Sequence, residues 1–437
     1  MEAGGKDRGG VGIAAGYNLA YPQKGKHGPP DVGAISGDRA ARDAGNRMSG
    51  GRILILATEF PPGPGGIGTH AYELARWLPE YGWEVRVCAC QDYAEREEIL
   101  RFNERRPFEV SSLIRASLPG GRLVHLTTGS LCGRAWKPDV VLATGRNAVL
   151  AGAWTRWFHR KARLVAVAHG TELQAGGILR RRLARKAFQQ SDLVIAVSGY
   201  TKRLLGGIGL EEGRVLVVPN GADANRFQPA TPAAVAGVRS KLGLGAGRAI
   251  LTVGHVSERK GQETVVRALP MVAEKVPDVE YWMAGLPSQR RFLEELAARL
   301  GVAGKVRFLG RLGEDALAEV VQACDVFAMT SRTTADGDYE GYGIAVIEAA
   351  LCGKPAVVSD CGGLPEAVLE GETGFVVPEG DAEATARALV RLLADAGLRQ
   401  QMGEAARRRA LAEGTWEKRA GQYDRVLREL VSLGGIA

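Results

Sequence analysis

Long apolar runs are the first feature that this chain of 437 residues lacks. No stretch approaches the roughly 20 apolar residues that span a bilayer, so the sequence predicts no transmembrane helix. Aromatic residues make up only 6% of the chain, and they do not alternate with basic residues. The net charge of +8 therefore favours anionic partners in general, without the aromatic ladder or zinc-finger spacing of a nucleic-acid-binding protein.

Cysteine is scarce as well, at six residues scattered along the chain: Cys88, Cys90, Cys132, Cys324, Cys352 and Cys361. Cys88 and Cys90 are separated by one residue, which is not the C-x-x-C spacing of a redox or zinc site. Most of the six lie beside strand-like runs. We therefore predict buried, reduced thiols and a cytoplasmic protein.

A regular apolar pattern is missing from residues 1–48, which are rich in glycine and mixed in charge. Such a segment cannot bury enough apolar surface to offset the entropy of ordering, so we predict a disordered extension. It lacks the continuous apolar core of a secretory signal. Met48 stands just before the first predicted strand, which leaves open whether residues 1–47 are translated.

From Arg52 onwards, short apolar runs alternate with amphipathic helical patterns, which predicts βαβ units and parallel sheets. The strand candidates are RILILAT, EVRVCAC, VVLAT, LVAVAHG, LVIAVS and VLVVPNG in the first half and AILTVGHV, VEYWMAG, KVRFLG, VFAMTS, PAVVS and GFVVP in the second. Segment 219–247 between them is rich in turn residues, as a linker is. The predicted fold class is α/β, with two Rossmann-like, doubly wound domains that face each other across a cleft.

We place the domain boundaries where this pattern changes. The N-terminal domain is expected at 49–222, the C-terminal domain at 223–413 and a final helical segment at 414–437. In doubly wound sheets, ligands bind beyond the carboxyl ends of the strands, so the candidate site residues are sought in the loops there.

A glycine-rich turn joins the first strand to the first helix in EFPPGPGGIGTH, residues 59–70. It contains a G-x-G-x-x-G pattern, and Asp92 lies where an NAD-binding protein has its ribose-binding acid. The prolines, however, fix φ and remove N–H donors, which suits a wide, stiff loop better than the NAD fingerprint. The glycines still allow backbone N–H groups to approach an anion. The turn is therefore either an anion site or a crossover in which glycine only fits sterically.

Two cations, Arg259 and Lys260, follow a predicted strand of the second half and precede a helical pattern. At the carboxyl edge of a sheet, an arginine fork and a lysine point charge can clamp a diphosphate. The alternative is a solvated surface pair, which is common for these residue types.

Two acids, Glu340 and Glu348, flank the start of a helical pattern in EGYGIAVIEAAL. About two helical turns separate them, so both can face one side. Gly341 and Gly343 leave backbone N–H groups open beside Glu340, which suits sugar hydroxyls and phosphate oxygens. Glu348 stands among apolar residues, where an unpaired carboxylate would be costly, and this favours a role such as binding both hydroxyls of a ribose.

The chain resembles the retaining glycosyltransferases of family 4 in a series of motifs that occur in the family's order: PPGPGGIGTHAYELARWL, AHGTE, VVPNGADANRFQP, VGHVSERKG, FLGRL, EGYGIAVIEAALCGKPAVVS and TGFVVPEGD. The resemblance covers nearly all of residues 50–435. It implies the GT-B fold, and a hexose-type sugar transferred from a nucleotide-diphosphate sugar to a hydroxyl acceptor with retention of configuration. It also implies that the last helix returns to the N-terminal domain.

The resemblance further implies roles for residues of the second half. Arg259 and Lys260 match the cationic pair that holds the donor diphosphate, and Glu348 matches the ribose-binding acid. Glu340 matches the acid that grips the donor sugar, together with the backbone of Gly341, Tyr342, Gly343 and Ile344. Gly310, Arg311 and Leu312 lie where the family's chain passes the nucleotide base.

In the first half, His169 of AHGTE matches the histidine that faces the transferred sugar across the cleft. Gly65 and Gly66 match the loop that closes over the phosphates. The residues predicted to be catalytic are thus Glu340, His169, Arg259 and Lys260. His255 is a departure, because many relatives carry an arginine at this position, and Arg259 is the candidate for the missing fork.

No D-x-D-like pair stands at a predicted strand end, so we predict a metal-independent reaction and no cofactor besides the donor substrate. Asp360 and Asp381 are isolated, and Asp336 and Asp338 are predicted to be solvated loop acids. The alternative functions are a nucleotide-sugar epimerase of the same fold and, less favoured, an NAD-dependent enzyme.

The acceptor is open among a sugar, a polysaccharide, a lipid-linked molecule and a small molecule. Two segments of the first half, Ala153–Leu164 and Ile178–Phe188, mix cations with apolar residues. They suit peripheral contact with an anionic membrane, and they equally suit the basic outer faces of crossover helices.

Overall fold

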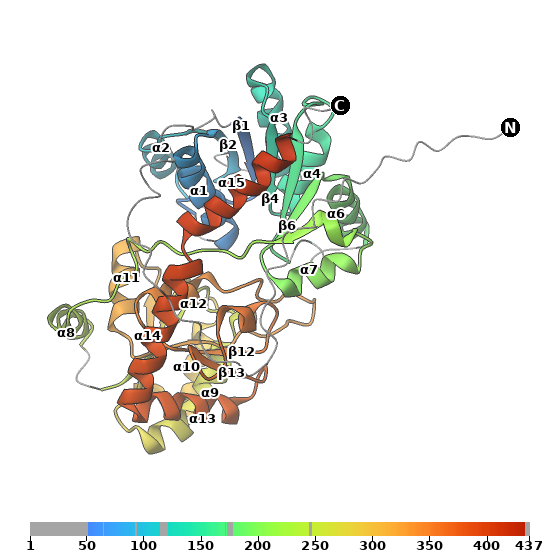
Figure 1. Ribbon diagram of the computed structural model, residues 1–437. Coiled ribbons are helices and arrows are strands. Elements are labelled where there is room, and N and C mark those ends of the chain that lie inside the picture. Colours follow the sequence, from blue (N-terminus) through green and yellow to red (C-terminus); the bar gives the residue numbers. More distant parts are fainter. Residues whose placement is uncertain are drawn as a thin grey trace, which may run out of the picture.

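The computed structural model describes residues 51–63, 65–91, 94–113, 121–170, 172, 178–243 and 247–432. The extension 1–48 and Asp92 lie outside the described residues. Two α/β domains are stacked one above the other, with the chain's first half in the upper domain of Figure 1. The predicted fold class is confirmed, because each domain is built on its own parallel sheet.

The N-terminal domain contains a sheet of seven strands in the order β3-β2-β1-β4-β5-β6-β7, with all pairs parallel. Its strands are β1 Arg52–Ala57, β2 Glu84–Cys90, β3 Glu109–Leu113, β4 Val140–Thr144, β5 Arg163–Ala168, β6 Leu193–Ala196 and β7 Val215–Val217. Both faces of this sheet are covered. Along β1, Ile53 and Ile55 pack into one apolar cluster, whereas Leu54 and Leu56 pack into another on the opposite face.

The C-terminal domain contains six parallel strands in the order β10-β9-β8-β11-β12-β13. They are β8 Ala249–Val253, β9 Glu280–Ala284, β10 Val306–Gly310, β11 Val326–Met329, β12 Ala356–Ser359 and β13 Gly374–Val377. In both sheets the order reverses beside the first strand of the domain, β1 or β8. At this point of a doubly wound sheet the adjoining loops diverge and leave room for a ligand.

Helices connect successive strands, as the periodicity predicts. In the N-terminal domain they are α1 Gly66–Trp77, η3 Leu78–Tyr81, α2 Arg96–Glu104, α3 Gly121–Cys132, η4 Gly133–Trp136, α4 Arg146–Thr155, α6 Ile178–Gln190, α7 Gly199–Gly206 and η5 Glu212–Arg214. The remainder are α8 Pro232–Lys241, η6 Glu258–Lys260, α9 Gln262–Lys275, α10 Arg290–Arg299, η7 Ala303–Lys305, α11 Glu314–Ala323, α12 Ile344–Leu351, η8 Leu364–Ala367, α13 Ala382–Ala394, α14 Ala396–Glu413 and α15 Trp416–Ser432.

Two elements differ from the expectation. Strand β3 was not among the predicted strands, because its sequence EVSSL contains two serines and lies at the edge of the sheet. Helix α8 lies inside the segment interpreted as a linker. Thr231 caps it by accepting a hydrogen bond from the backbone N–H of Ala234, and Pro232 occupies its first turn. Arg239 of α8 then pairs with Asp325 at 2.6 Å, which fastens the helix to the C-terminal domain.

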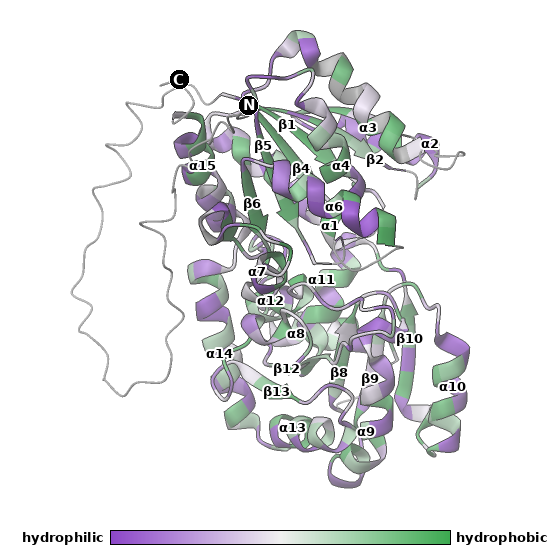
Figure 2. Cartoon of the chain, turned by 90° about the vertical axis from the view of Figure 1, so that its right-hand side faces the viewer, coloured by the Kyte–Doolittle hydropathy of each residue, from purple (hydrophilic) through white to green (hydrophobic). Residues whose placement is uncertain are grey.

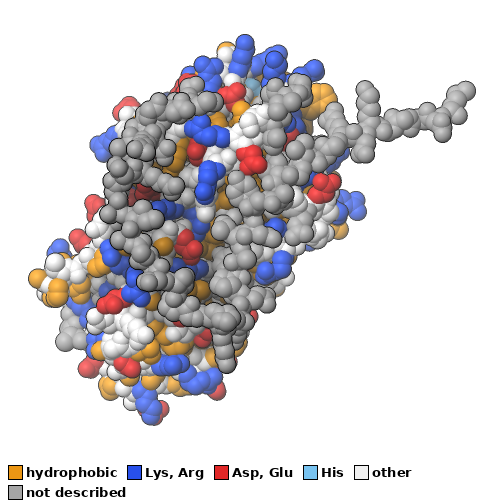
Figure 3. Space-filling view, in the orientation of Figure 1, with side chains coloured by type: hydrophobic (Ala, Val, Ile, Leu, Met, Phe, Trp, Pro, Cys, Tyr) orange, Lys and Arg blue, Asp and Glu red, His pale blue; other side chains and the backbone are white. Residues whose placement is uncertain are grey.

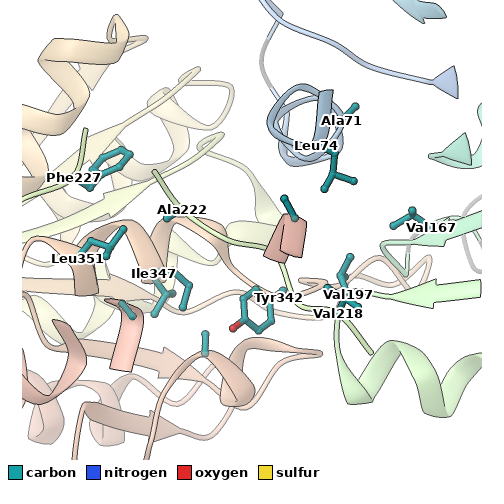
Figure 4. Close-up of a cluster of buried hydrophobic side chains, with 14 of the residues drawn as sticks. Ala71, Leu74, Val167, Val197, Val218, Ala222, Phe227, Tyr342, Ile347 and Leu351 are labelled. Atoms are coloured by element: carbon teal, nitrogen blue, oxygen red, sulfur yellow. The ribbon is translucent and has the colours of Figure 1, made fainter. Parts of the chain in front are cut away.

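The domains share one continuous apolar cluster where they meet. Figure 4 shows Leu74 of α1 and Val197 of the upper domain near Tyr342 and Ile347 of the lower domain. Phe227, from the connection between the domains, belongs to the same cluster. The apolar side chains therefore hold the two halves together over a broad junction.

The last helix returns to the N-terminal domain. In Figure 1, α14 lies along the lower domain and α15 continues upwards beside α1. The side chain of Trp83 donates a hydrogen bond to Asp424 of α15 at 2.7 Å, and Arg428 donates to the carbonyl of Tyr81. Among the described residues, no helix combines the length and apolar character that crossing a membrane requires.

The chain crosses between the domains twice, and the two crossings contact each other. The backbone N–H of Ala222 donates to the carbonyl of Gly414 at 2.9 Å, and that of Trp416 donates to the carbonyl of Ala222 at 3.1 Å. Gly221 fits here because a Cβ atom at this position would stand 2.7 Å from the nitrogen of Trp416.

Candidate functional site

The two predicted cations lie in η6, in the turn between β8 and α9. Gly261 ends this turn with φ +64°, and a Cβ atom on it would lie 1.9 Å from the carbonyl oxygen of Thr330. Only glycine fits so close to the end of β11. The turn therefore presents Arg259 and Lys260 to the loop that follows β11, at the carboxyl edge of the sheet.

Glu340 meets both cations. Its Oε2 accepts a hydrogen bond from Nη1 of Arg259 at 2.7 Å and another from Nζ of Lys260 at 2.7 Å. Arg259 also pairs through Nε with Asp338 at 3.2 Å. The sequence places these residues about 80 positions apart, and the sheet topology brings them into one cluster.

The charges of this cluster are stabilised by one another. Burial alone would raise the pKa of Glu340, but Lys260 and Arg259 outweigh it and lower the pKa to about 2. Burial opposes the charge of Arg259 too, yet Glu340 and Asp338 raise its pKa above the ordinary value. Glu340 is therefore ionised at neutral pH, and Arg259 stays charged beside it.

Glu348 lies in α12, whose N-terminus is formed by Gly343 with φ +98°. Its carboxylate is half-buried and has no hydrogen bond to any residue that the structure describes. Burial raises the pKa of Glu348 to about 7, with Arg226 and Lys260 lowering it and Glu73 raising it further. A carboxylate in this state gains stability from a ligand that donates hydrogen bonds.

His169 follows β5 directly and lies on the N-terminal side of the domain junction. Its Nε2 is 2.8 Å from the hydroxyl of Thr144 at the end of β4. Burial lowers the pKa of His169 to about 3, so the imidazole is neutral at physiological pH. The ring also contacts that of His70, with centroids 5.0 Å apart.

The backbones of the two domains touch beside His169. A Cβ atom on Gly341 would lie 2.3 Å from the carbonyl oxygen of His169. A Cβ atom on Gly170 would lie 2.1 Å from the hydroxyl of Tyr339. Glycine at both positions therefore permits the approach that brings His169 next to the segment holding Glu340.

The glycine turn of the N-terminal domain faces α12 as well. Gly66 begins α1, and a Cβ atom on it would be 3.7 Å from Cδ1 of Ile344, the first residue of α12. Gly65 precedes it with φ +142°. Arg311 reaches across from the C-terminal domain, since its Nη2 donates to the carbonyl oxygen of Pro62 at 2.8 Å. Two helix N-termini, α1 and α12, thus point at the same region.

The remaining predicted donor-binding residues differ in what they expose. Gly310 ends β10 with φ +68°, and Leu312 is half-buried beyond Arg311. Tyr342 is 3% exposed and packs into the apolar cluster between the domains, so its side chain has a structural place there.

Residues 239–409 match the family Glycosyl transferases group 1, and residues 64–226 match Glycosyltransferase Family 4. The chain is 35% identical over 405 residues to a GDP-mannose-dependent alpha-(1-6)-phosphatidylinositol monomannoside mannosyltransferase of Mycolicibacterium smegmatis, covering 86% of this chain and 98% of that protein. The chain belongs to glycosyltransferase family 4.

Other similar proteins agree with this membership. A GDP-mannose-dependent monoacylated alpha-(1-6)-phosphatidylinositol monomannoside mannosyltransferase of Corynebacterium glutamicum is 30% identical, over 84% of this chain and 95% of its own. The structure of Anabaena HepE in complex with UDP and glucose superimposes with a TM-score of 0.73 at 24% identity, covering 86% of this chain and 99% of that one. Sucrose-phosphate synthase of Thermosynechococcus elongatus gives a TM-score of 0.70 at 22% identity, over 88% and 100%. These two structures show that the glycosyltransferase has the GT-B fold.

Sequence reasoning missed two buried residues of the glycosyltransferase site. His70 of α1 lies between His169 and the last helix, and its Nε2 is 2.9 Å from the hydroxyl of Tyr423. Glu172 accepts hydrogen bonds from the backbone N–H groups of His169 and Gly170, at 3.1 and 2.8 Å, and so fixes the turn after β5. Both residues stand inside motifs that carry the family resemblance, and that position is the signal that could have singled them out.

One predicted surface acid belongs to the site instead. Asp338 was expected to be solvated, but it is half-buried and pairs with Arg259 because the loop after β11 folds over η6. Asp336 is exposed, as expected, and Asp381 caps α13 by accepting a hydrogen bond from the backbone N–H of Ala384. His255 is exposed beside Ser288, so Arg259 is the residue of this turn that offers a guanidinium fork.

Metal ligands do not gather in the part of the glycosyltransferase that the structure describes: no group of three or more His, Cys, Asp or Glu side chains is arranged to hold an ion there. Five cysteines in the same part are buried and take part in no disulfide, namely Cys88, Cys90, Cys324, Cys352 and Cys361. The side chain of Cys132 lies outside the described atoms.

Proposed function

We propose that this glycosyltransferase transfers mannose from GDP-mannose to a hydroxyl of a lipid-linked acceptor, with retention of configuration and without a metal ion. The observation that carries the reaction is the contact of Glu340 with Arg259 and Lys260, together with the close approach of the neighbouring Gly341 to the carbonyl of His169 across the domain junction. The choice of donor and acceptor is supported by the relatives at 35% and 30% identity, whose names specify GDP-mannose and a phosphatidylinositol monomannoside.

The C-terminal domain would hold the leaving group. As the bond from sugar C1 to the diphosphate oxygen breaks, the electron pair leaves with the phosphate, and negative charge grows there. Arg259, Lys260 and the N-terminus of α12 are fixed where they stabilise that charge most as it develops. The sugar meanwhile passes through an oxocarbenium-like state.

Retention follows if the acceptor attacks from the face that the phosphate leaves. The acceptor oxygen forms the new bond to C1, and its proton passes to the departing phosphate oxygen. This path needs no enzyme nucleophile. Glu340 is unsuited to that role, because both cations already hold its carboxylate and keep its pKa at about 2. We assign Glu340 to the sugar hydroxyls and to the positioning of the cations.

The N-terminal domain would contact the transferred sugar with uncharged groups. His169 is neutral and hydrogen-bonded to Thr144, so it can contact the transferred sugar without adding a positive charge beside the oxocarbenium. Glu348 would bind the ribose, because its half-buried carboxylate has no hydrogen-bond partner among the described residues and can accept from two hydroxyl groups. Approach of the two domains excludes water and limits hydrolysis of the donor.

A donor panel tests the proposal. Thermal shift with GDP-mannose, UDP-glucose and ADP-glucose should give the largest stabilisation with GDP-mannose, since a bound ligand raises the melting temperature by mass action. Product analysis with a phosphatidylinositol mannoside acceptor should then show an α-linked mannose and released GDP. A β-linked product would refute retention, and stabilisation by UDP-glucose alone would refute the donor.

Activity should also survive treatment with EDTA. The cationic pair and two helix N-termini supply the positive charge that a divalent ion provides elsewhere. Loss of activity that added Mg²⁺ restores would contradict the metal-free reaction.

A further inference from the structure

One stretch of the N-terminal domain carries the whole excess of positive charge of this protein. Residues 146–190 contain ten Lys and Arg residues and a single acid, Glu172. The rest of the chain, with 47 basic and 48 acidic residues, is almost neutral. Because Glu172 is 1% exposed and accepts backbone hydrogen bonds, it does not offset the surface charge. The net charge of +8 is therefore a local property.

The same stretch exposes large apolar side chains. At the end of α4 and just beyond it, Trp154 and Trp157 are 64% and 78% exposed. At the start of α6, Ile178 and Leu179 are 69% and 71% exposed. With Phe158 and Leu183 they make up six of the fourteen exposed large apolar residues that the described ranges contain. Exposed apolar side chains gathered in this way usually mark an interaction surface.

The two groups lie on one side of the domain, because α4 and α6 pack against each other. Nη1 of Arg156, at the end of α4, donates to the carbonyl of Gln190 at the end of α6, and Trp157 and Arg160 line a shallow hollow beside them. Figure 2 looks at this side of the molecule, where hydrophilic and hydrophobic segments alternate along α6. We call this region the α4–α6 surface, and define it by Trp154, Trp157, Phe158, Arg160, Lys161, Ile178, Leu179, Arg180, Arg182, Leu183, Arg185 and Lys186.

The cations of α6 point outwards. Only Ala184, Ala187 and Phe188 of this helix are buried. In the described part of the chain, no ion pair holds Arg180, Arg182, Arg185 or Lys186. By contrast, Arg290 and Arg291 of α10 pair with glutamates one turn further on. The front face of the molecule likewise mixes acidic and basic side chains over both domains (Figure 3).

We propose that the α4–α6 surface binds the surface of an anionic lipid bilayer, with its tryptophans and aliphatic side chains inserted at the headgroup boundary. Charge complementarity supports a membrane: Arg180, Arg182, Arg185 and Lys186 have no ion pair in the described part of the chain, and exposed apolar side chains lie among them. Tryptophan prefers the interfacial region of a bilayer, because its ring has both an apolar body and a polar N–H group.

The position of the surface fits the reaction, and this part of the inference rests on the proposed function. Helix α6 follows β5 along the chain and runs back along the sheet, so Ile178 and Leu179 lie at the carboxyl edge, where His169 follows β5. A bilayer that contacts this first turn of α6 would hold a lipid-linked acceptor on the same side as His169. The surface would therefore deliver the acceptor headgroup to the site.

Co-sedimentation with vesicles tests the surface directly. The whole protein should sediment with vesicles that contain about one-third phosphatidylglycerol, and release as salt screens the charges. Neutral phosphatidylcholine vesicles should bind it at least about tenfold more weakly. The variants R180E/R182E/K186E and W154S/W157S should each lower the affinity for anionic vesicles by about tenfold or more.

A matched control reverses three exposed cations of the other domain, in the variant K275E/R299E/R387E, and it should bind vesicles like the wild type. Equal loss in this control would overturn the assignment to the α4–α6 surface, as would a wild type that ignores anionic vesicles. A dimer in size-exclusion chromatography that W154S/W157S disperses would also overturn it, in favour of a second copy as occupant.

Release of GDP from GDP-mannose in detergent-free buffer separates the two proposals. The surface variants should keep this donor hydrolysis, because none of the substituted residues touches the donor cluster. Vesicle binding without any use of GDP-mannose would refute the proposed function and still support the membrane-binding surface. Use of GDP-mannose without vesicle binding would do the reverse.

Discussion

The two halves of the site handle charge in opposite ways. In the C-terminal domain, Glu340 forms ion pairs with Arg259 and Lys260, and Asp338 pairs with Arg259. In the N-terminal domain, His169 is a buried neutral group. The backbones of the two domains approach each other there at Gly170 and Gly341. Under the proposed function, the C-terminal half would supply fixed charge for the diphosphate, and the N-terminal half would supply an uncharged surface around the sugar.

Removing a cation should have the largest effect. In Lys260→Ala, kcat should fall by about 10²–10³, because a fixed charge at the developing oxyanion is lost and Glu340 loses one of its two partners. KM for the donor should change less, which steady-state kinetics measures. Lys275→Ala, on the exposed end of α9, is the control and should match the wild type. An unchanged kcat in Lys260→Ala would contradict the proposal that the C-terminal domain supplies fixed positive charge to the leaving diphosphate.

Blocking the approach of the two halves should have the next largest effect. In Gly341→Ala, the new Cβ atom would stand 2.3 Å from the carbonyl oxygen of His169, so the domains must move apart. Turnover should fall by at least about tenfold, since a small misplacement near the chemistry is costly. Small-angle scattering should show a larger radius of gyration.

Gly304→Ala is the matched control for this substitution, because a Cβ atom there meets no other atom within 4 Å. Its kinetics and radius should equal those of the wild type. If Gly341→Ala behaved in the same way, contact between the halves would not matter for catalysis.

Glu348→Gln should change how the nucleotide affinity of the C-terminal domain depends on pH. Burial raises the pKa of Glu348 to about 7, so its ionised fraction grows as the pH rises through 7. Nucleotide affinity of the wild type should therefore increase between about pH 6 and pH 8. The Gln variant should bind about tenfold more weakly at the upper pH, without this rise. Isothermal titration calorimetry measures both.

The free energy of unfolding should depend on pH in the opposite direction to the nucleotide affinity. The unfolded carboxyl ionises at its ordinary, lower pKa, so the unfolded state binds fewer protons than the folded state up to about pH 7. The free energy of unfolding should thus fall as the pH rises over this range, and less so in Glu348→Gln. Glu383→Gln, an exposed acid of α13, should change neither property.

The smallest effect is expected at the neutral half. In Tyr423→Phe, the buried hydrogen bond to His70 is lost, at a cost of about 1–2 kcal/mol in the free energy of unfolding. Urea denaturation measures this. Tyr81→Phe removes an exposed hydrogen bond to the carbonyl of Glu417 and should cost less. Equal costs would argue against a buried polar contact between α1 and α15.

How far the sequence predicts this structure depends on what each residue contacts. The buried strands are predicted, because strands covered on both faces are continuous apolar runs. Strand β3 is not predicted, because it lies at the edge of the sheet and contains two serines. Helix α8 was overlooked although Thr231 and Pro232 are a recognised start signal, because the surrounding turn residues dominated the pattern.

The location of the candidate site is predictable from the sequence, but the ion pairs between its side chains are not. Arg259, Lys260 and Glu340 each follow a strand, so topology places them at one edge of the sheet. That Glu340 joins both cations, and that Asp338 joins Arg259, depends on loop conformation that spacing along the chain does not encode. His70 was overlooked because a helix that is packed on both sides gives its polar residue no distinctive period.

The paired crossings at Ala222 and Gly414 set how the halves can move. Hydrogen bonds join the two crossings, so a rotation of one domain against the other would have its pivot at Ala222 and Gly414. Because α15 is anchored on the upper domain beyond this pivot, a swing that opens the donor site carries the end of the chain with the acceptor half. The distance from the pivot to Glu340 and His169 then sets how far a small rotation separates donor from acceptor.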